Sequence, residues 1–246
     1  MLKLISVNVE GPKHYKTVFP LIDNENPDVL CLQEAPFEMR TWLQERGYKT
    51  SFAPMVRRTF GDIEHIIGIL LATKLPQKTR LYYYWQSPED IPALYNPDYP
   101  ALTVSNAYLI ATILDNGIEY NIATTHVMDT SNGAPDSHQE KGVSLLIESL
   151  GKEPSHVICG DFNMPRHHNN LYEKFTKLYR DEIPKHYQSS LDRNLHRLGK
   201  VKIDQPIFDK FMVDYIFAKP EYEVTQERLE FGVSDHAAIV AYVAKV

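Results

Sequence analysis

Carboxylate, amide and imidazole side chains stand at the ends of several short apolar runs in this sequence. Glu34 follows one such run, Asp161 and Asn163 follow a second, and Asp235 and His236 precede the last one. Because Asp161 and Asn163 are two residues apart, an extended backbone places both side chains on one face. The ends of strands in a rigid scaffold are suited to holding functional side chains at fixed positions.

Carboxylates that converge in this way repel one another unless a cation lies among them. Asp214 lies inside another apolar run, and Asn8 directly follows the first run of the chain. Oxygen ligands without a cage of cysteines and histidines indicate Mg²⁺ or Mn²⁺ rather than structural zinc. These residue types therefore predict a divalent-metal site.

Each feature alone has a simpler interpretation. An Asp-His pair is more often part of a surface turn, and Gly-Asp-x-Asn is a common turn sequence. A Glu after a strand is usually a loop residue, and Asp214 could be a buried acid with satisfied hydrogen bonds. A chance combination of all of them is improbable, so together they favour a functional site.

The apolar runs have the length and the β-branched content of strands. We expect strands at Leu2 to Val7, Asp28 to Leu32, Ile66 to Ala72, Ala107 to Leu114, Tyr120 to Thr125, His156 to Cys159, Met212 to Phe217 and Ala237 to Val243. We expect helices at Tyr15 to Asn24, Pro36 to Arg46, Ser137 to Leu150 and Asn170 to Tyr179. With no repeat and no linker-like stretch, residues 1–246 are predicted to form a single α/β domain.

Bulk properties exclude several classes of protein. The chain is 43% hydrophobic, which argues against disorder, and its formal net charge of -6 argues against a generic nucleic-acid binder. Cys31 and Cys159 lie in apolar runs, so we expect buried free thiols. The sequence shows no secretory signal, and no apolar run approaches the roughly 20 residues that span a bilayer. We therefore expect a soluble, cytoplasmic monomer.

Two segments interrupt the strand pattern. Ser87 to Pro100 contains prolines at a density that forbids regular structure, so an ordered loop or a lid is expected. Segment 166–202 holds nine Lys/Arg and four Asp/Glu, a formal charge of +5. It forms either a solvated surface or a basic wall that receives a polyanion such as nucleic acid, with phosphates contacted by Arg166, Arg193 or Arg197.

In their order along the chain, the motifs resemble those of the endonuclease/exonuclease/phosphatase superfamily, which includes DNase I. The matching segments are Ser6-Val7-Asn8-Val9-Glu10-Gly11, Leu32-Gln33-Glu34, Thr125-His126-Val127, Gly160-Asp161-Phe162-Asn163, Val213-Asp214-Tyr215-Ile216-Phe217 and Ser234-Asp235-His236. The resemblance implies a four-layer α/β sandwich, in which two packed mixed β-sheets are flanked by helices and the site lies at one edge.

The resemblance also implies metal ligands. Glu34 is similar to the principal metal ligand of the family, and Asp235 is expected to bind the same ion. Glu10 or Asn8 would contribute directly or through water. The cofactor implied by this oxygen-rich set is Mg²⁺ or Mn²⁺.

Catalytic roles follow from the same resemblance. Asp161 and Asn163 would orient the attacking water and hold the phosphoryl group. His236, beside its partner Asp214, would either deprotonate that water or stabilise the transition state. His126 matches the histidine that protonates the leaving group in some branches of the superfamily.

The expected function is divalent-metal-dependent hydrolysis of a phosphodiester by in-line attack of an activated water. The basic segment and His126 favour a nuclease or a nucleotide phosphodiesterase. A phospholipid or inositol-phosphate phosphoesterase is the alternative, although the sequence shows no exposed apolar hairpin of the kind an interfacial enzyme needs. A catalytically silent binding module is a further alternative, against which the complete set of polar residues argues.

Overall fold

Two six-stranded mixed β-sheets pack face to face in the computed structural model, which describes residues 1–88, 90–130, 132–197 and 209–246. The first sheet has the strand order β11 (Tyr222–Glu230), β12 (Ala238–Lys245), β1 (Leu2–Asn8), β2 (Val29–Pro36), β4 (Ile63–Thr73) and β3 (Lys49–Phe60). The second has the order β5 (Gln77–Trp85), β6 (Asn106–Asp115), β7 (Ile118–His126), β8 (Val157–Asp161), β10 (Asp214–Ala218) and β9 (Arg180–Asp181). In each sheet the two central strands are parallel (β1 and β2, β7 and β8), and all the other neighbouring strands are antiparallel.

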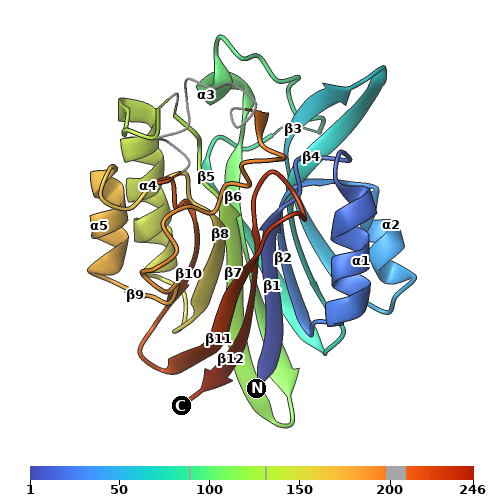
Figure 1. Ribbon diagram of the computed structural model, residues 1–246, viewed down its shortest axis with the longest axis vertical. Coiled ribbons are helices and arrows are strands. Elements are labelled where there is room, and N and C mark those ends of the chain that lie inside the picture. Colours follow the sequence, from blue (N-terminus) through green and yellow to red (C-terminus); the bar gives the residue numbers. More distant parts are fainter. Residues whose placement is uncertain (89, 131, 198–208) are drawn as a thin grey trace.

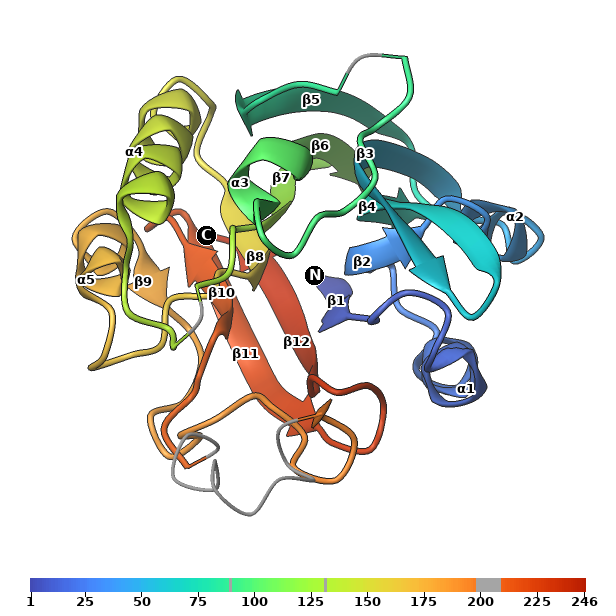
Figure 2. The same cartoon turned by 90° about the horizontal axis from the view of Figure 1, so that it is seen from above.

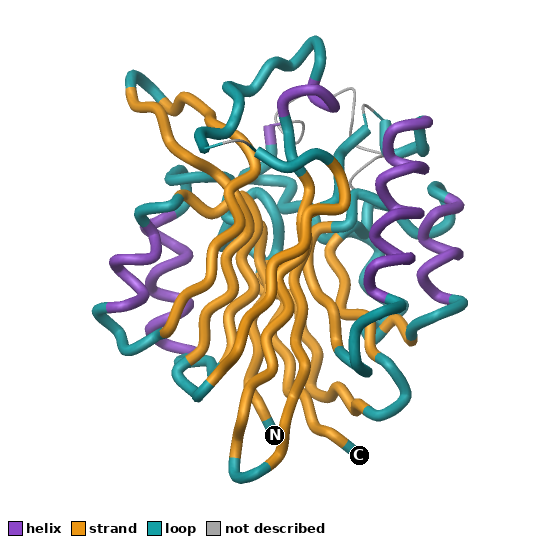
Figure 3. The backbone as a smooth tube through the Cα atoms, turned by 180° about the vertical axis from the view of Figure 1, so that it is seen from behind, coloured by secondary structure: helices purple, strands orange, loops and turns teal. Residues whose placement is uncertain are grey.

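Helices cover the outer face of each sheet, as Figures 1 and 2 show. The helices are α1 (Tyr15–Glu25), α2 (Met39–Gln44), α3 (Pro100–Thr103), α4 (Ser137–Leu150) and α5 (Asn170–Thr176). The first two lie outside the first sheet, and α4 and α5 lie outside the second, so that strands occupy the middle of the molecule (Figure 3). This arrangement confirms the predicted four-layer α/β sandwich.

Side chains alternate between two apolar cores along the strands. On β1, Leu2 and Leu4 belong to the core between the sheets, whereas Ile5 and Val7 pack in the core beneath α1 and α2. This alternation follows from the two-residue period of an extended chain. Cys31 and Cys159 are buried free thiols, as the sequence predicts.

The parallel pairs determine where the chain brings polar residues together. β1 pairs with β2 in parallel, with Asn8 opposite Gln33, and β7 pairs with β8 in parallel, with His126 opposite Asp161. Parallel strands end at the same edge of a sheet, so the carboxyl ends of all four strands lie at one edge of the sandwich. The two chain termini lie at the opposite edge (Figure 1).

Several elements differ from the prediction. β3, β5, β9 and β11 are not predicted from the sequence. All four lie at sheet edges, where β9 is only two residues long and the other three have many exposed or half-buried residues instead of an apolar run. Helix α2 is shorter than the predicted range, because Pro36 still belongs to β2. Between residues 87 and 100, the described part has no helix or strand before α3 begins at Pro100, as predicted. Among the described residues, no helix is long and apolar enough to cross a membrane.

Candidate active site

Two hydrogen bonds between side chains join the sheets at the edge where the strands end. The Asn8 amide at the end of β1 donates to Asp161 Oδ2 at the end of β8, over 3.1 Å. Beneath it, the buried Gln33 amide donates to the Thr124 hydroxyl over 2.9 Å. Polar side chains from both sheets therefore meet in one place, and each of these buried donors has its acceptor in the other layer.

Asp161 lies at the centre of this group. Its Oδ1 accepts a hydrogen bond of 3.0 Å from the backbone N–H of Asn163. Its Oδ2 lies 3.6 Å from His126 Nε2 and 3.8 Å from His236 Nε2, in addition to the bond from Asn8. The residue is 1% exposed. Both imidazoles therefore face one carboxylate oxygen.

Burial and neighbouring charges change the pKa of this carboxyl. Burial raises the pKa of Asp161 to about 6, and the negative charge of Asp214 acts in the same direction. The charges of His236 and His126 act against the shift. A carboxyl that titrates near neutral pH can accept a proton and release it under working conditions.

His236 is held by a second carboxylate. Its Nδ1 lies 2.7 Å from Asp214 Oδ2, which also accepts a hydrogen bond of 2.6 Å from the Ser190 hydroxyl. Burial alone would lower the pKa of His236, but the carboxylates of Asp214 and Asp161 outweigh burial and raise it well above its usual value. The arrangement therefore keeps this imidazole protonated, with Nε2 directed towards Asp161.

Asn163 and His126 form the opposite side of the group. The Asn163 side-chain amide donates to the carbonyl oxygen of Val127 over 2.8 Å and lies 3.3 Å from His126 Nε2. The backbone carbonyl oxygen of Asn163 accepts a hydrogen bond of 2.9 Å from the side-chain amide of Gln139, at the start of α4. Helix α4 thus fixes the loop that follows β8.

Glu34 is turned into the cleft by an irregularity in β2. The register between β2 and β4 shifts between Leu32 and Ala35, and Glu34 adopts a φ of 49°. Its carboxylate accepts a bond of 2.9 Å from Arg58 on β3. Burial would raise the pKa of Glu34, yet the positive charges of Arg58, His126 and His236 together outweigh burial and lower it. The Arg58 guanidinium also lies over the ring of Tyr95, 4.5 Å from its centre.

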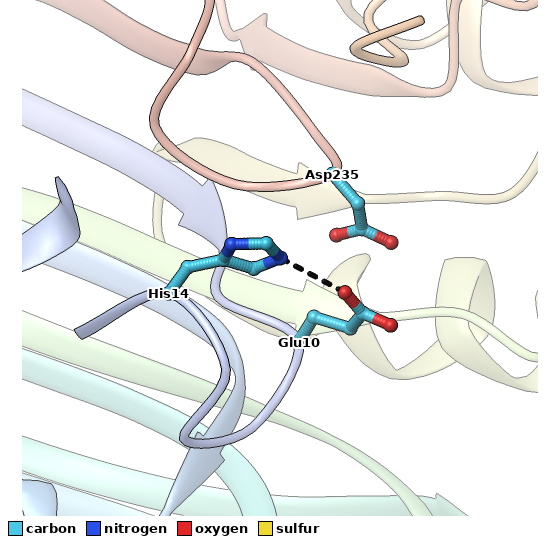
Figure 4. Close-up of side chains that lie close together, drawn as sticks. All are labelled: Glu10, His14 and Asp235. Carbon is cyan, nitrogen blue, oxygen red and sulfur yellow. Dashed lines mark hydrogen bonds and ion pairs between the residues drawn. The ribbon is translucent and has the colours of Figure 1, made fainter. Parts of the chain in front are cut away.

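Glu10, His14 and Asp235 form a second cluster beside this one (Figure 4). His14 Nε2 lies 2.9 Å from Glu10 Oε2, and the Lys13 ammonium bonds the other oxygen of that carboxylate. Potential ligand atoms of the three residues all lie within 4.8 Å of one another. Burial raises the pKa of Asp235, and the nearby charges of Glu10 and Glu34 add to the effect.

The structure brings the residues predicted from the sequence into one cleft. Eight of them line it, namely Asn8, Glu10, Glu34, His126, Asp161, Asn163, Asp235 and His236. Asp214, the ninth, lies behind His236 and bonds its ring. The cleft is acidic at its base and is a suitable place for a cation.

Other residues of the cleft could not be recognised from the sequence. Lys13, Arg58, Tyr95, Asn106 and His196 also line it. The sequence indicates a loop at Arg58, because half-exposed β3 lacks the pattern of a strand. Tyr95 stands out only as one aromatic residue within the proline-rich segment. The positions of these side chains in the cleft depend on packing between segments far apart in the sequence, which no local sequence pattern indicates.

Segment 166–202 forms a basic wall only in part. Arg166 is buried, donates to the carbonyl oxygen of Ile183 over 3.1 Å, and does not line the cleft. Arg193 pairs with Asp209 and borders a separate depression. Of the lysines and arginines of the segment that the structure describes, Arg197 alone lines this cleft. Lys200 and Lys202 lie outside the described residues.

Comparisons with known proteins show the family and the fold of this chain. The model of the endonuclease/exonuclease/phosphatase family matches residues 5–236. A search of curated proteins gave no match. The solved structure of the human Nocturnin catalytic domain with bound sulfate anion is similar, with a TM-score of 0.68, 18% identity, and coverage of 100% of this chain and 94% of that chain.

Two further solved structures share the fold. TDP2 of D. rerio complexed with single strand DNA product has a TM-score of 0.71 and 16% identity, covering 99% of each chain. The mannosyl-6-phosphatase of Bacteroides thetaiotaomicron has a TM-score of 0.67 and 15% identity, covering 99% of this chain and 100% of that one. Because the family model spans nearly the whole chain, the protein belongs to the endonuclease/exonuclease/phosphatase family, whose members are phosphoester hydrolases.

Proposed function

We propose that the protein hydrolyses a phosphodiester with the help of a divalent cation, Mg²⁺ or Mn²⁺, and that its substrate is a nucleic acid or a nucleotide. The observation that carries this proposal is the position of Asp161. Its buried carboxylate lies between two imidazoles and accepts hydrogen bonds from Asn8 and Asn163. Such a carboxylate can hold an attacking water and take its proton.

The two histidines have different parts in this proposal. His236 is kept protonated by Asp214, so it stabilises the negative charge that develops on the phosphoryl group. His126 carries no such carboxylate partner on its other nitrogen among the described residues, and it would donate a proton to the leaving oxygen. Asn163, which lies 3.3 Å from His126, would hold a phosphoryl oxygen.

The donor set fits a divalent cation. The cleft collects the carboxylates of Glu10, Glu34 and Asp235, and the negative charges of the first two help to raise the pKa of Asp235. A cation bound there would neutralise the charge of the phosphoryl oxygens and favour attack by water. Asn8 acts as a positioning residue, because its Oδ1 already accepts from the Glu10 N–H over 3.1 Å and its amide donates to Asp161.

Groups at the rim support a polyanionic substrate. The cations of Lys13, Arg58 and Arg197 line the cleft, and Tyr95 offers an aromatic face on which a base can stack. The similar TDP2 structure was solved with a single-stranded DNA product, so a strand can be received by this fold. Together these features favour a nucleic acid over a small phosphomonoester.

One observation favours a second candidate, the phospholipid class. Ile91, Leu94, Tyr99 and Leu102 are between 48% and 66% exposed, and they lie in the segment that contributes Tyr95 to the cleft. From the sequence we expected no exposed apolar hairpin, so these exposed side chains weaken that argument against an interfacial enzyme. Apolar side chains near a catalytic cleft are suited to contact with a lipid surface.

A panel of substrates separates these functions. The protein is incubated with Mg²⁺ or Mn²⁺, with and without EDTA, against single-stranded DNA, RNA, plasmid, bis-p-nitrophenyl phosphate, inositol phosphates and sphingomyelin vesicles. We expect turnover of nucleic acid that stops in EDTA. Turnover of sphingomyelin alone would replace the nucleic-acid proposal with the lipid one. Absence of turnover on every substrate, or turnover that persists in EDTA, would refute the metal-dependent phosphodiesterase.

A further inference from the structure

An imidazole that the sequence motifs do not include takes part in the acidic cluster beside Asp161. His14 lies at the start of α1, and its Nε2 is 2.9 Å from Glu10 Oε2. Asp235 approaches from the loop between β11 and β12, and Figure 4 shows its carboxylate facing the other two side chains. The three groups offer one nitrogen and two carboxylate donors within 4.8 Å of one another.

The backbone around this cluster is fixed by local contacts. Glu10 has a φ of 48°, and the next residue, Gly11, has a φ of 67°. A Cβ at Gly11 would lie 2.4 Å from the ring of Phe60, which would have to move, and the positive φ of Gly11 itself favours glycine. The Gly11 N–H donates to the carbonyl oxygen of Glu34 over 3.1 Å. Glu10 is thus held against the strand end that carries Glu34.

A further contact ties His14 to the loop of Asp235. The Thr17 hydroxyl is within hydrogen-bonding reach of two carbonyl oxygens, those of His14 and Val233. The His14 carbonyl also accepts the Val18 N–H over 2.8 Å, which begins the helix. His14 and Asp235 therefore keep their relative positions without the help of their own side chains.

The spacing of the donor atoms suits one metal ion. Two ligand atoms that each lie about 2.1 Å from an ion, at right angles to each other, are about 3.0 Å apart. The His14 nitrogen and the Glu10 oxygen are separated by 2.9 Å. The imidazole is 15% exposed and the Glu10 carboxylate 20%, so solvent and a hydrated ion can both reach them.

We propose that His14 binds the catalytic divalent cation through Nε2, together with Glu10 and Asp235, and that the site consequently prefers Mn²⁺ to Mg²⁺. This inference rests on the proposed metal-dependent function and specifies its cofactor. Mg²⁺ prefers oxygen ligands, whereas transition ions bind imidazole more tightly. A mixed set of one nitrogen and two carboxylates therefore shifts the preference towards Mn²⁺.

Pulsed electron paramagnetic resonance of bound Mn²⁺ tests this assignment directly, because it detects nitrogen coordinated to the ion. Wild-type protein stripped with EDTA and loaded with Mn²⁺ should show nitrogen coupling. The His14→Gln variant should lose this coupling, and calorimetry should show that its affinity for Mn²⁺ falls about tenfold or more, with a smaller change for Mg²⁺. Circular dichroism establishes that the variant is folded. The His14→Ala variant repeats the test with a side chain that has no group able to bind the ion.

His65 supplies a matched control. It forms a His–Glu pair with Glu38 that is not part of the cluster of Glu10, His14 and Asp235, so His65→Gln should leave both the nitrogen coupling and the Mn²⁺ affinity unchanged. Persistence of the coupling in His14→Gln would overturn the inference, as would its loss only in His126→Gln or His236→Gln. If wild-type protein binds Mn²⁺ and turns over substrate but shows no nitrogen coupling, the role of His14 is refuted while the proposed metal-dependent function stands. Failure of wild-type protein to bind either ion would refute the proposed metal-dependent function and this inference together.

Discussion

The imidazole of His236 lies between two buried carboxylates, and their charges decide its protonation. Asp214 is the nearer, with its Oδ2 2.7 Å from Nδ1, whereas Asp161 Oδ2 lies 3.8 Å from Nε2. Burial opposes the protonated form, so the raised pKa of His236 depends on these neighbours. In the proposed reaction the histidine acts as a cation.

Removing the charge of Asp214 should therefore change the pH dependence of the enzyme. In Asp214→Asn, the pKa of His236 should fall, because the nearest of the carboxylates that together outweigh burial is lost. The protonated form is then lost at lower pH, so the alkaline limb of the pH–rate profile moves towards neutral pH. Histidine side-chain NMR titration and the pH profile of kcat measure the two effects. An unchanged alkaline limb would show that protonated His236 is not required.

Among single residues, those next to the ends of apolar runs could be predicted from the sequence, whereas those that reach the cleft from elsewhere could not. Asp161 and Asn163 were recognisable because they directly follow an apolar run. Arg58 on β3 reaches Glu34 on β2 although β4 lies between the two strands, and His14 reaches Glu10 only through the turn before α1. Such contacts depend on tertiary packing, which a single sequence does not display.

At the scale of elements, close contact between β7 and β8 positions Asp161. Gly160 pairs with Thr125 and has a φ of 148°. A Cβ at this position would lie 2.0 Å from the Thr125 carbonyl oxygen, a backbone atom that cannot move without separating the strands. Glycine is therefore required directly before Asp161, the carboxylate proposed to act in catalysis.

We expect Gly160→Ala to lower the free energy of unfolding by about 3 kcal/mol, through strain and disrupted pairing. Gly142→Ala is the matched control, because Gly142 lies in α4 with open space where a Cβ would be added, and alanine there should stabilise by about 0.5–1 kcal/mol. Urea denaturation followed by circular dichroism measures both changes. Equal stability of the two variants would contradict the close approach of β7 and β8.

The elements themselves were predictable where a strand is buried on both faces. β1, β6 and β8 were found from their apolar runs, and α4 was predicted with its observed bounds of Ser137–Leu150. β5 was missed because most of its residues are exposed or half-buried. An edge strand lacks the continuous apolar pattern that reveals a central one.

At the scale of the whole molecule, the distribution of charge matters more than the net charge of -6. Acidic side chains gather at the base of the cleft, and Lys13, Arg58 and Arg197 stand among the residues that line it. A polyanion is repelled by the molecule as a whole but can meet positive charge at this rim. Binding of a nucleic acid should accordingly depend on salt.

Replacing Arg197 tests this point. In Arg197→Ala, the slope of log affinity for single-stranded DNA against log salt should decrease in magnitude by about 0.7, because one phosphate contact is lost. Lys177→Ala is the matched control, since Lys177 belongs to the same segment 166–202 but lies at the end of α5 and does not line the cleft. Fluorescence anisotropy across a salt series measures both slopes. If the two variants have the same slope as wild type, Arg197 does not contact phosphate.

Hydrolysis of a phosphodiester in this cleft is proposed to depend on Asp161 and a divalent cation together. The decisive quantity is the rate of hydrolysis of bis-p-nitrophenyl phosphate in Mn²⁺ by wild type, Asp161→Asn and the exposed control Asp62→Asn, each repeated in EDTA. We expect Asp161→Asn to be about 100- to 10,000-fold slower in kcat, Asp62→Asn to match wild type, and EDTA to abolish turnover. Near wild-type turnover by a folded Asp161→Asn variant, or turnover unaffected by EDTA, would show that the proposed reaction is wrong.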